Sequence, residues 1–257
     1  MFECIFQEYK KNKPVKAFTL AEVLITLGII GVVASLTIPS LLANSQKKQT
    51  VESLKKTFSI FSSAFKASQA ENGFDLGVQT YATDADKESF IQNYLLKYLK
   101  IEKYCGNIEN NQECFIPEIK DLKGTKNTNY SNYNLKFYNF VLADGTSVKA
   151  WVSTSGINSG ADIVLLVDIN GFKKPNVLGK DIFKLYYIFS SATFPPGVYV
   201  YGLDTSMNRL QDPTRDILLD SSSKFNCNNS ITSGYAGDNC AALIQLDGWE
   251  IKDDYPW

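Results

Sequence analysis

The chain has 257 residues and is almost neutral, with 26 basic and 27 acidic side chains. This balance provides no overall field to attract nucleic acid, and the absence of histidine removes the commonest general base near neutral pH. The sequence also lacks the glycine patterns of nucleotide-binding loops and of the hydrolase nucleophile elbow. We therefore expect a protein that is not an enzyme.

The first predicted element is an apolar helix. From Phe18 to Ala43 the only charged residue is Glu22, and a proline, Pro39, lies near the end. As a helix these residues span about 39 Å, and the hydrocarbon core of a bilayer is about 30 Å thick. The apolar region of a secretory signal peptide is shorter, about 7 to 15 residues. The segment 18–43 is therefore predicted to span a membrane.

Glu22 is the unusual residue of this segment, because a carboxylate within lipid costs about 2–3 kcal/mol or more. One interpretation is a charge that reaches the membrane interface, since Glu22 lies near the start of the segment. The other is a carboxylate that pairs with a positive charge from another chain.

The stretch "KAFTLAEVLITLGIIGVVASLTIPSLL", residues 16–42, resembles the N-terminal signature of type IV pilins and of type II secretion pseudopilins. The resemblance implies cleavage between Ala17 and Phe18, N-methylation of Phe18, and a glutamate, Glu22, at the fifth position of the mature chain. Pro39 falls where this family has a helix-bending proline. One departure is Ala17, since the family usually has glycine before the cut.

The resemblance implies an architecture and a set of partners. Residues 1–17 would be a cytoplasmic leader removed by a prepilin peptidase, and the N-terminus would face the cytoplasm of a bacterial inner membrane. Glu22 would then pair with the new α-amino group of Phe18 on a neighbouring subunit. The partners would be membrane lipid before assembly, copies of the chain, other pilin-like subunits and an inner-membrane assembly platform.

Three functions remain open from the sequence. A pseudopilin of type II secretion is slightly favoured over a type IV pilin for adhesion, motility or DNA uptake. Without the leader the chain has 22 basic and 25 acidic residues, so no nucleic acid partner is expected. The alternative of another class is an unprocessed single-span membrane protein whose head binds a ligand.

The helix is predicted to continue past the membrane and to cover residues 18–72. Apolar residues spaced three and four apart form one stripe, which we expect to pack on a globular head. Asn72-Gly73 is a typical helix end. The stripe consists of Val51, Leu54, Phe58, Phe61 and Phe65.

Residues 73–257 are predicted to form an extracytoplasmic head with an antiparallel sheet, so that the whole chain is α+β. Residues 87–100 read as a short helix, and 135–153 as a hairpin around Asp144-Gly145. Residues 161–189 read as a second strand pair around Asn170-Gly171, and residues 197–203 as a further strand. Residues 240–251 are expected to form a helix, with Trp249 docked on the head.

Four of the five cysteines follow the apolar segment, and only Cys4 precedes it. An even set fits disulfides in an oxidising compartment, and four cysteines allow three connectivities. We favour Cys105–Cys114 and Cys227–Cys240, because each pair closes a short polar loop. A zinc site is the alternative, although no C-x-x-C spacing supports it.

One metal site is considered, for calcium, at Asp168, Asn170 and Asp181. The spacing D-x-N-G matches part of a calcium loop, but the remaining acidic positions of an EF-hand are missing. The resemblance adds that some major pseudopilins carry calcium near their C-terminal loops. The alternative is a hairpin turn in which Asn170-Gly171 supplies positive φ.

Overall fold

The computed structural model describes residues 18–73, 83–107, 113–127, 130, 136–153, 162–189, 195–203 and 213–257. It forms two compact units, Met1–Gln46 and Lys47–Trp257. The division falls inside the first helix, α1 (Leu20–Asn72), and not at its end.

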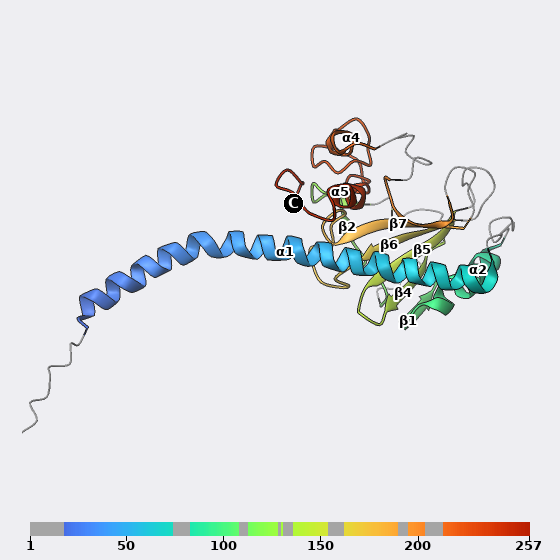
Figure 1. The fold of residues 1–257 in the computed structure, drawn as a ribbon, viewed down its shortest axis with the longest axis horizontal. Coiled ribbons are helices and arrows are strands. Elements are labelled where there is room, and N and C mark those ends of the chain that lie inside the picture. The colour runs from blue at the N-terminus through green and yellow to red at the C-terminus, as the bar shows by residue number, and fades with distance from the viewer. Residues whose placement is uncertain are drawn as a thin grey trace, which may run out of the picture. The chain divides into compact units, whose positions relative to one another are not determined.

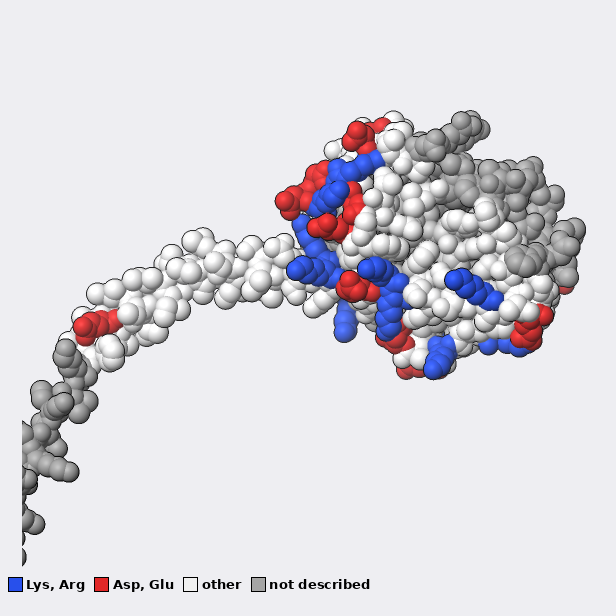
Figure 2. All heavy atoms as spheres, in the orientation of Figure 1, with Lys and Arg blue, Asp and Glu red and all other residues white. Residues whose placement is uncertain are grey.

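The first unit contains the N-terminal part of α1, and its large apolar side chains are exposed. It belongs to a helix long and apolar enough to cross a membrane, with a mean hydropathy of 2.2 in its most apolar window. Pro39 lies inside α1, which continues without interruption. In Figure 2 this part of the chain is almost free of charged side chains, as a candidate membrane anchor should be.

The rest of α1 belongs to the second unit and packs on the head, as predicted. Val51, Leu54, Phe61 and Phe65 are buried, and Phe58 packs against the same core. The helix ends at the predicted place because Gly73 adopts φ +80° and donates its N–H to the Gln69 carbonyl at 2.9 Å.

The head is built on a six-stranded antiparallel sheet (Figure 1) with the order β1-β4-β5-β6-β7-β8. A separate two-stranded sheet pairs β2 with β3. A long N-terminal helix on an antiparallel sheet confirms the predicted α+β class. The strands are β1 (Ile101–Gly106), β2 (Ile119–Lys120), β3 (Lys126–Asn127), β4 (Tyr138–Leu142), β5 (Ser147–Ser153), β6 (Asp162–Asp168), β7 (Ile182–Ile188) and β8 (Gly197–Val200).

The six-stranded sheet is buried on both faces. In β6, Ile163 and Leu165 join the core under α1, whereas Val164 and Leu166 point to a second, aromatic-rich core on the opposite face. Burial on both faces explains why β6 reads as a continuous apolar run. Across the first core, the rings of Phe65 in α1 and Tyr187 in β7 meet at 4.8 Å.

The predicted hairpin around Asp144-Gly145 is confirmed, since β4 and β5 pair there and Gly145 adopts φ +88°. The second predicted strand pair, β6 and β7, is also confirmed. Its connection is longer than a hairpin turn, however, and runs from residue 169 to 181. Gly171 begins it with φ +69°, and Asn176 makes a second bend with φ +60°.

The helix predicted at 87–100 is shifted and divided. It is α2 (Asp84–Tyr94), followed by the 3-10 helix η2 (Leu96–Tyr98). It begins earlier because the Thr83 hydroxyl accepts from the Asp86 N–H while Asp86 accepts from the Thr83 N–H, which is a capping box. This signal lies before the apolar positions used for the prediction.

Two further helices complete the described residues, α4 (Arg215–Leu219) and α5 (Cys240–Leu246). The helix predicted at 240–251 is therefore confirmed but shorter. Trp249 docks on the head as expected, and its ring lies 5.5 Å from that of Phe58. Strands β1, β2 and β3 and helix α4 were not predicted.

Candidate functional site

The first candidate site is the start of α1, where Glu22 makes a capping box with Thr19. The Thr19 N–H and hydroxyl both donate to Glu22 Oε2 at 2.8 Å. The Glu22 N–H donates in return to the Thr19 hydroxyl at 3.2 Å. The carboxylate therefore satisfies donors that a helix start leaves unpaired, and it lies at the positive end of the helix dipole.

The sequence carried a signal for this arrangement, Thr19-Leu20-Ala21-Glu22, which the prediction did not use. Phe18, the predicted first residue of the mature chain, is 84% exposed. Ala17 lies outside the described residues. The roles predicted for Ala17, Phe18, Glu22 and Pro39 in cleavage, methylation and assembly stay predictions.

The surface around this site is apolar throughout the described part of the first unit, residues 18–46. Glu22 contributes the only formal charge between Phe18 and Gln46, and all the large apolar residues there are exposed. Such a surface needs lipid or other apolar chains around it, because contiguous apolar area of this extent is rare on soluble monomers. These residues are Leu20, Val23, Leu24, Ile25, Leu27, Ile29, Ile30, Val32, Val33, Leu36, Ile38, Leu41 and Leu42.

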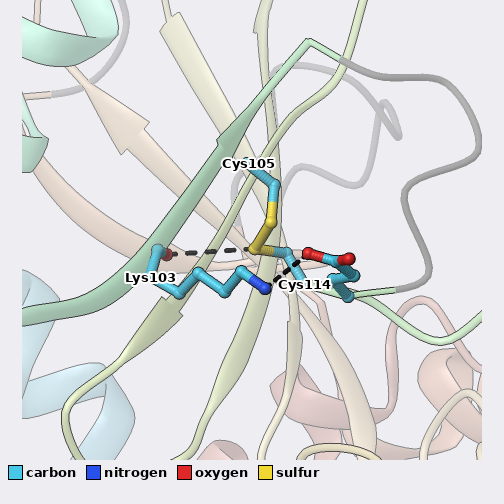
Figure 3. Close-up of a disulfide and its surroundings, with 4 residues drawn as sticks. Lys103, Cys105 and Cys114 are labelled. Carbon is cyan, nitrogen blue, oxygen red and sulfur yellow. Dashed lines mark hydrogen bonds and ion pairs between the residues drawn. A yellow bond between two sulfur atoms is a disulfide. The ribbon is translucent and has the colours of Figure 1, made fainter.

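Both predicted disulfides are present. Cys105 and Cys114 join with Cα atoms 6.1 Å apart, and Cys227 and Cys240 with Cα atoms 4.7 Å apart. Figure 3 shows the first bond beside Lys103. The Lys103 amine pairs with the Glu113 carboxylate, with 2.5 Å between their charged atoms. All four half-cystines are buried, which is typical of structural disulfides.

The predicted calcium residues do come together in the β6–β7 connection, but Asp181 already has protein partners. Its carboxylate accepts the backbone N–H groups of Asn176 and Val177, both at 2.7 Å, and the side-chain amide of Asn170 at 3.1 Å. Asp181 therefore holds the second bend of the connection in place.

Asp168 is the less satisfied carboxylate of the two. It is fully buried, its Oδ1 accepts the Asn170 N–H at 3.3 Å, and its Oδ2 has no protein partner. The side-chain oxygens of Asn170 and Asn176 are also buried without a partner. Among the described residues no group of three or more His, Cys, Asp or Glu side chains could hold a metal ion. Calcium binding by this mixed carboxylate and amide set stays a prediction.

Asp168 gives the head a testable pH dependence. Burial and the neighbouring Asp181 raise the pKa of Asp168 to about 8, against about 3.9 in an unfolded chain. Between about pH 4 and 8 the folded state keeps a proton on Asp168 that the unfolded state loses. The contribution of Asp168 to the free energy of unfolding is therefore most favourable at low pH and declines as the pH rises to about 8. Thermal melts with a chelator should show this decline, and Asp168→Asn should reduce it.

The same melts test the calcium prediction. At pH 8.5 added calcium should raise the melting temperature of the native chain and leave that of the Asp168→Asn variant unchanged, because the amide has no charge to offer the ion. An equal response of both proteins would exclude Asp168 as a ligand.

Two family models match the chain. One, described as a family of unknown function (DUF6613), matches residues 40–257. The other, described as the prokaryotic N-terminal methylation motif, matches residues 12–38 and is the type IV pilin and pseudopilin signature. It confirms the resemblance carried by residues 16–42. No curated protein matches the chain, and no solved structure matches it. The chain belongs to this family of unknown function and begins with a type IV pilin-like methylation signature.

Proposed function

We propose that this protein is a structural, noncatalytic subunit of a pilin-like filament. The observation that carries the proposal is the methylation motif at residues 12–38, whose residues from Leu20 onward lie on a helix that exposes apolar side chains and one carboxylate. A membrane holds such a helix before assembly, and neighbouring helices of the same kind replace the lipid afterwards.

In this proposal Glu22 sets the stagger between subunits. The α-amino group of Phe18, created by cleavage, pairs with Glu22 of a neighbouring subunit. A single ion pair inside an apolar helix bundle contributes register more than stability, because a shifted neighbour leaves two charges unpaired in an apolar environment. The capping box with Thr19 occupies the carboxylate until the neighbour arrives.

The filament system is the finer part of the proposal, and we favour a pseudopilus of type II secretion. The α+β head with the Asp168–Gly171 turn supports this choice. The two disulfides favour the alternative of a type IV pilin. Deletion of the gene distinguishes the two filament systems. Loss of a pseudopilin blocks secretion of proteins, whereas loss of a pilin removes surface fibres.

The first test is the N-terminal mass of the mature chain after coexpression with a prepilin peptidase. We expect a chain that starts at Phe18 and carries one methyl group on its α-amino nitrogen. The matched variant is Ala17→Gly, which restores the residue usual in the family and should be cut at least as completely. Replacement of Ala17 by a bulky residue should prevent the cut.

An intact chain that starts at Met1 would contradict the proposal, provided that the peptidase cuts a control substrate in the same cells. The single-span protein with a ligand-binding head would then be the better interpretation. That alternative also predicts that Glu22 is dispensable.

A further inference from the structure

A lysine and an aspartate lie in direct contact inside the second core of the head. Lys184 is on β7, and Asp238 lies two residues before the start of α5. Their side chains are 8% and 0% exposed, and Lys184 Nζ is 3.1 Å from Asp238 Oδ2. A buried pair of this kind loses much of its Coulomb energy to desolvation, so as an ion pair it contributes little to stability.

The surroundings of this pair are aromatic. Lys184 Nζ lies 3.7 Å from the ring centroid of Tyr201, and 5.6 and 5.8 Å from those of Tyr130 and Trp151. These rings hold the amine against the carboxyl group while they exclude water. Asp238 Oδ1 has no protein partner, and burial raises the pKa of Asp238. The apolar environment therefore favours the protonated form of the Asp238 carboxyl group.

Tyr130 connects the two groups through its hydroxyl. Lys184 Nζ donates to Tyr130 Oη at 3.3 Å, and Tyr130 Oη donates to Asp238 Oδ2 at 2.5 Å. A proton can pass along this path, from the amine to the hydroxyl and from the hydroxyl to the carboxylate. The result is a neutral amine next to a neutral carboxylic acid, which is the reactive form of the two groups.

We propose that Lys184 and Asp238 form an intramolecular amide bond. After the proton transfer, the lone pair of Lys184 Nζ attacks Asp238 Cγ and a C–N bond forms. The carboxyl hydroxyl leaves with a second amine proton, so that one C–O bond breaks and one water molecule is released. No electron transfer and no added reactant are needed. The fixed contact supplies the high effective concentration that an amide condensation requires.

The bond joins parts of the head that are distant in sequence. It links β7 to the segment before α5 across a separation of 54 residues, next to the Cys227–Cys240 disulfide. The amide then ties the segment before α5 to the sheet at β7, while the disulfide ties α5 to the loop at Cys227. This inference does not depend on the proposed function, since the cross-link can form in any folded copy of the head.

The test is the intact mass of the purified full-length chain with its disulfides reduced. We expect a mass lower than that of the sequence by one water molecule, and a proteolytic fragment in which the Lys184 and Asp238 peptides are joined. The Lys184→Arg variant keeps the positive charge but cannot form the amide, so it should show the full mass. Asp238→Asn should lose one ammonia molecule in place of water.

The Tyr130→Phe variant tests the proton path, because it keeps the ring and removes only the hydroxyl. We expect most of its chains to stay unlinked while both disulfides still form. A native chain of full mass with both disulfides formed would overturn the proposal and leave Lys184 and Asp238 as a buried ion pair. Loss of water that persists in Lys184→Arg would overturn it as well.

Discussion

A Glu22→Ala chain should enter the membrane and lose its leader normally, yet form almost no filaments. The substitution leaves the α-amino group of Phe18 without a partner in the apolar bundle. An unpaired charge in such a place costs about 3–5 kcal/mol, so the association constant of each subunit should fall roughly 150- to 4,000-fold. The measurement is the amount of sedimenting filament in cells that contain equal amounts of processed subunit.

A matched variant separates the charge of Glu22 from its contact with Thr19. Glu22→Gln keeps a side-chain oxygen that can accept the Thr19 N–H, but it has no charge for the Phe18 amine. If the ion pair directs assembly, Glu22→Gln should fail like Glu22→Ala. If the capping box is what matters, Glu22→Gln should assemble well and Thr19→Ala should not. Filaments at native levels from Glu22→Gln would therefore contradict the proposed pairing.

Local patterns explain which parts of the fold could be predicted from the sequence. The helix end at Gly73 and the hairpin at Gly145 depend on residues adjacent in the chain, and both were correctly placed. The stripe from Val51 to Phe65 repeats with helical spacing and was correctly assigned to the core. The disulfides were predicted correctly because each pair is close in sequence, with 9 and 13 residues of separation.

The errors arise where tertiary contacts override the local pattern. Strand β1 alternates poorly, since Glu102 and Lys103 are both exposed, and its position at the sheet edge comes from pairing with β4. The connection between β6 and β7 does turn at Asn170-Gly171 as predicted, with φ +69° at Gly171. It is longer than a hairpin turn, however, because the Asp181 carboxylate accepts the backbone N–H groups of Asn176 and Val177 and holds a second bend.

The candidate sites also differ in whether a local sequence pattern predicts them. Thr19 and Glu22 are three residues apart, so the local sequence was sufficient to predict their capping box, although this prediction was not made. The contact of Lys184 with Asp238 has no local signal, because the fold brings together groups separated by 54 residues. Sequence reasoning can find a capping box at a helix start, therefore, but not a buried charged pair assembled across the head.

The second prediction with a large expected effect is the loss of stability on removal of the Cys227–Cys240 disulfide. Replacing both cysteines by alanine should lower the free energy of unfolding by about 2–5 kcal/mol. Part of this loss is the entropy of the opened loop. The rest is packing, because both side chains are fully buried and belong to the main core. The Cys240 sulfur is packed so closely that a Cβ on Gly179 would lie 2.5 Å from it. Denaturant unfolding of the native and variant chains measures the difference.

The Cys105–Cys114 pair is the matched control for that measurement. It closes a loop of similar length, so its entropic contribution is similar. Its buried neighbourhood is much smaller, since the two cysteines cluster only with Val141 and not with the main core. Alanine at Cys105 and Cys114 should therefore cost less than alanine at Cys227 and Cys240. An equal decrease in the free energy of unfolding would mean that both disulfides stabilise the fold through loop closure alone. The cavity left between α5 and the sheet would then be filled by neighbouring side chains without cost.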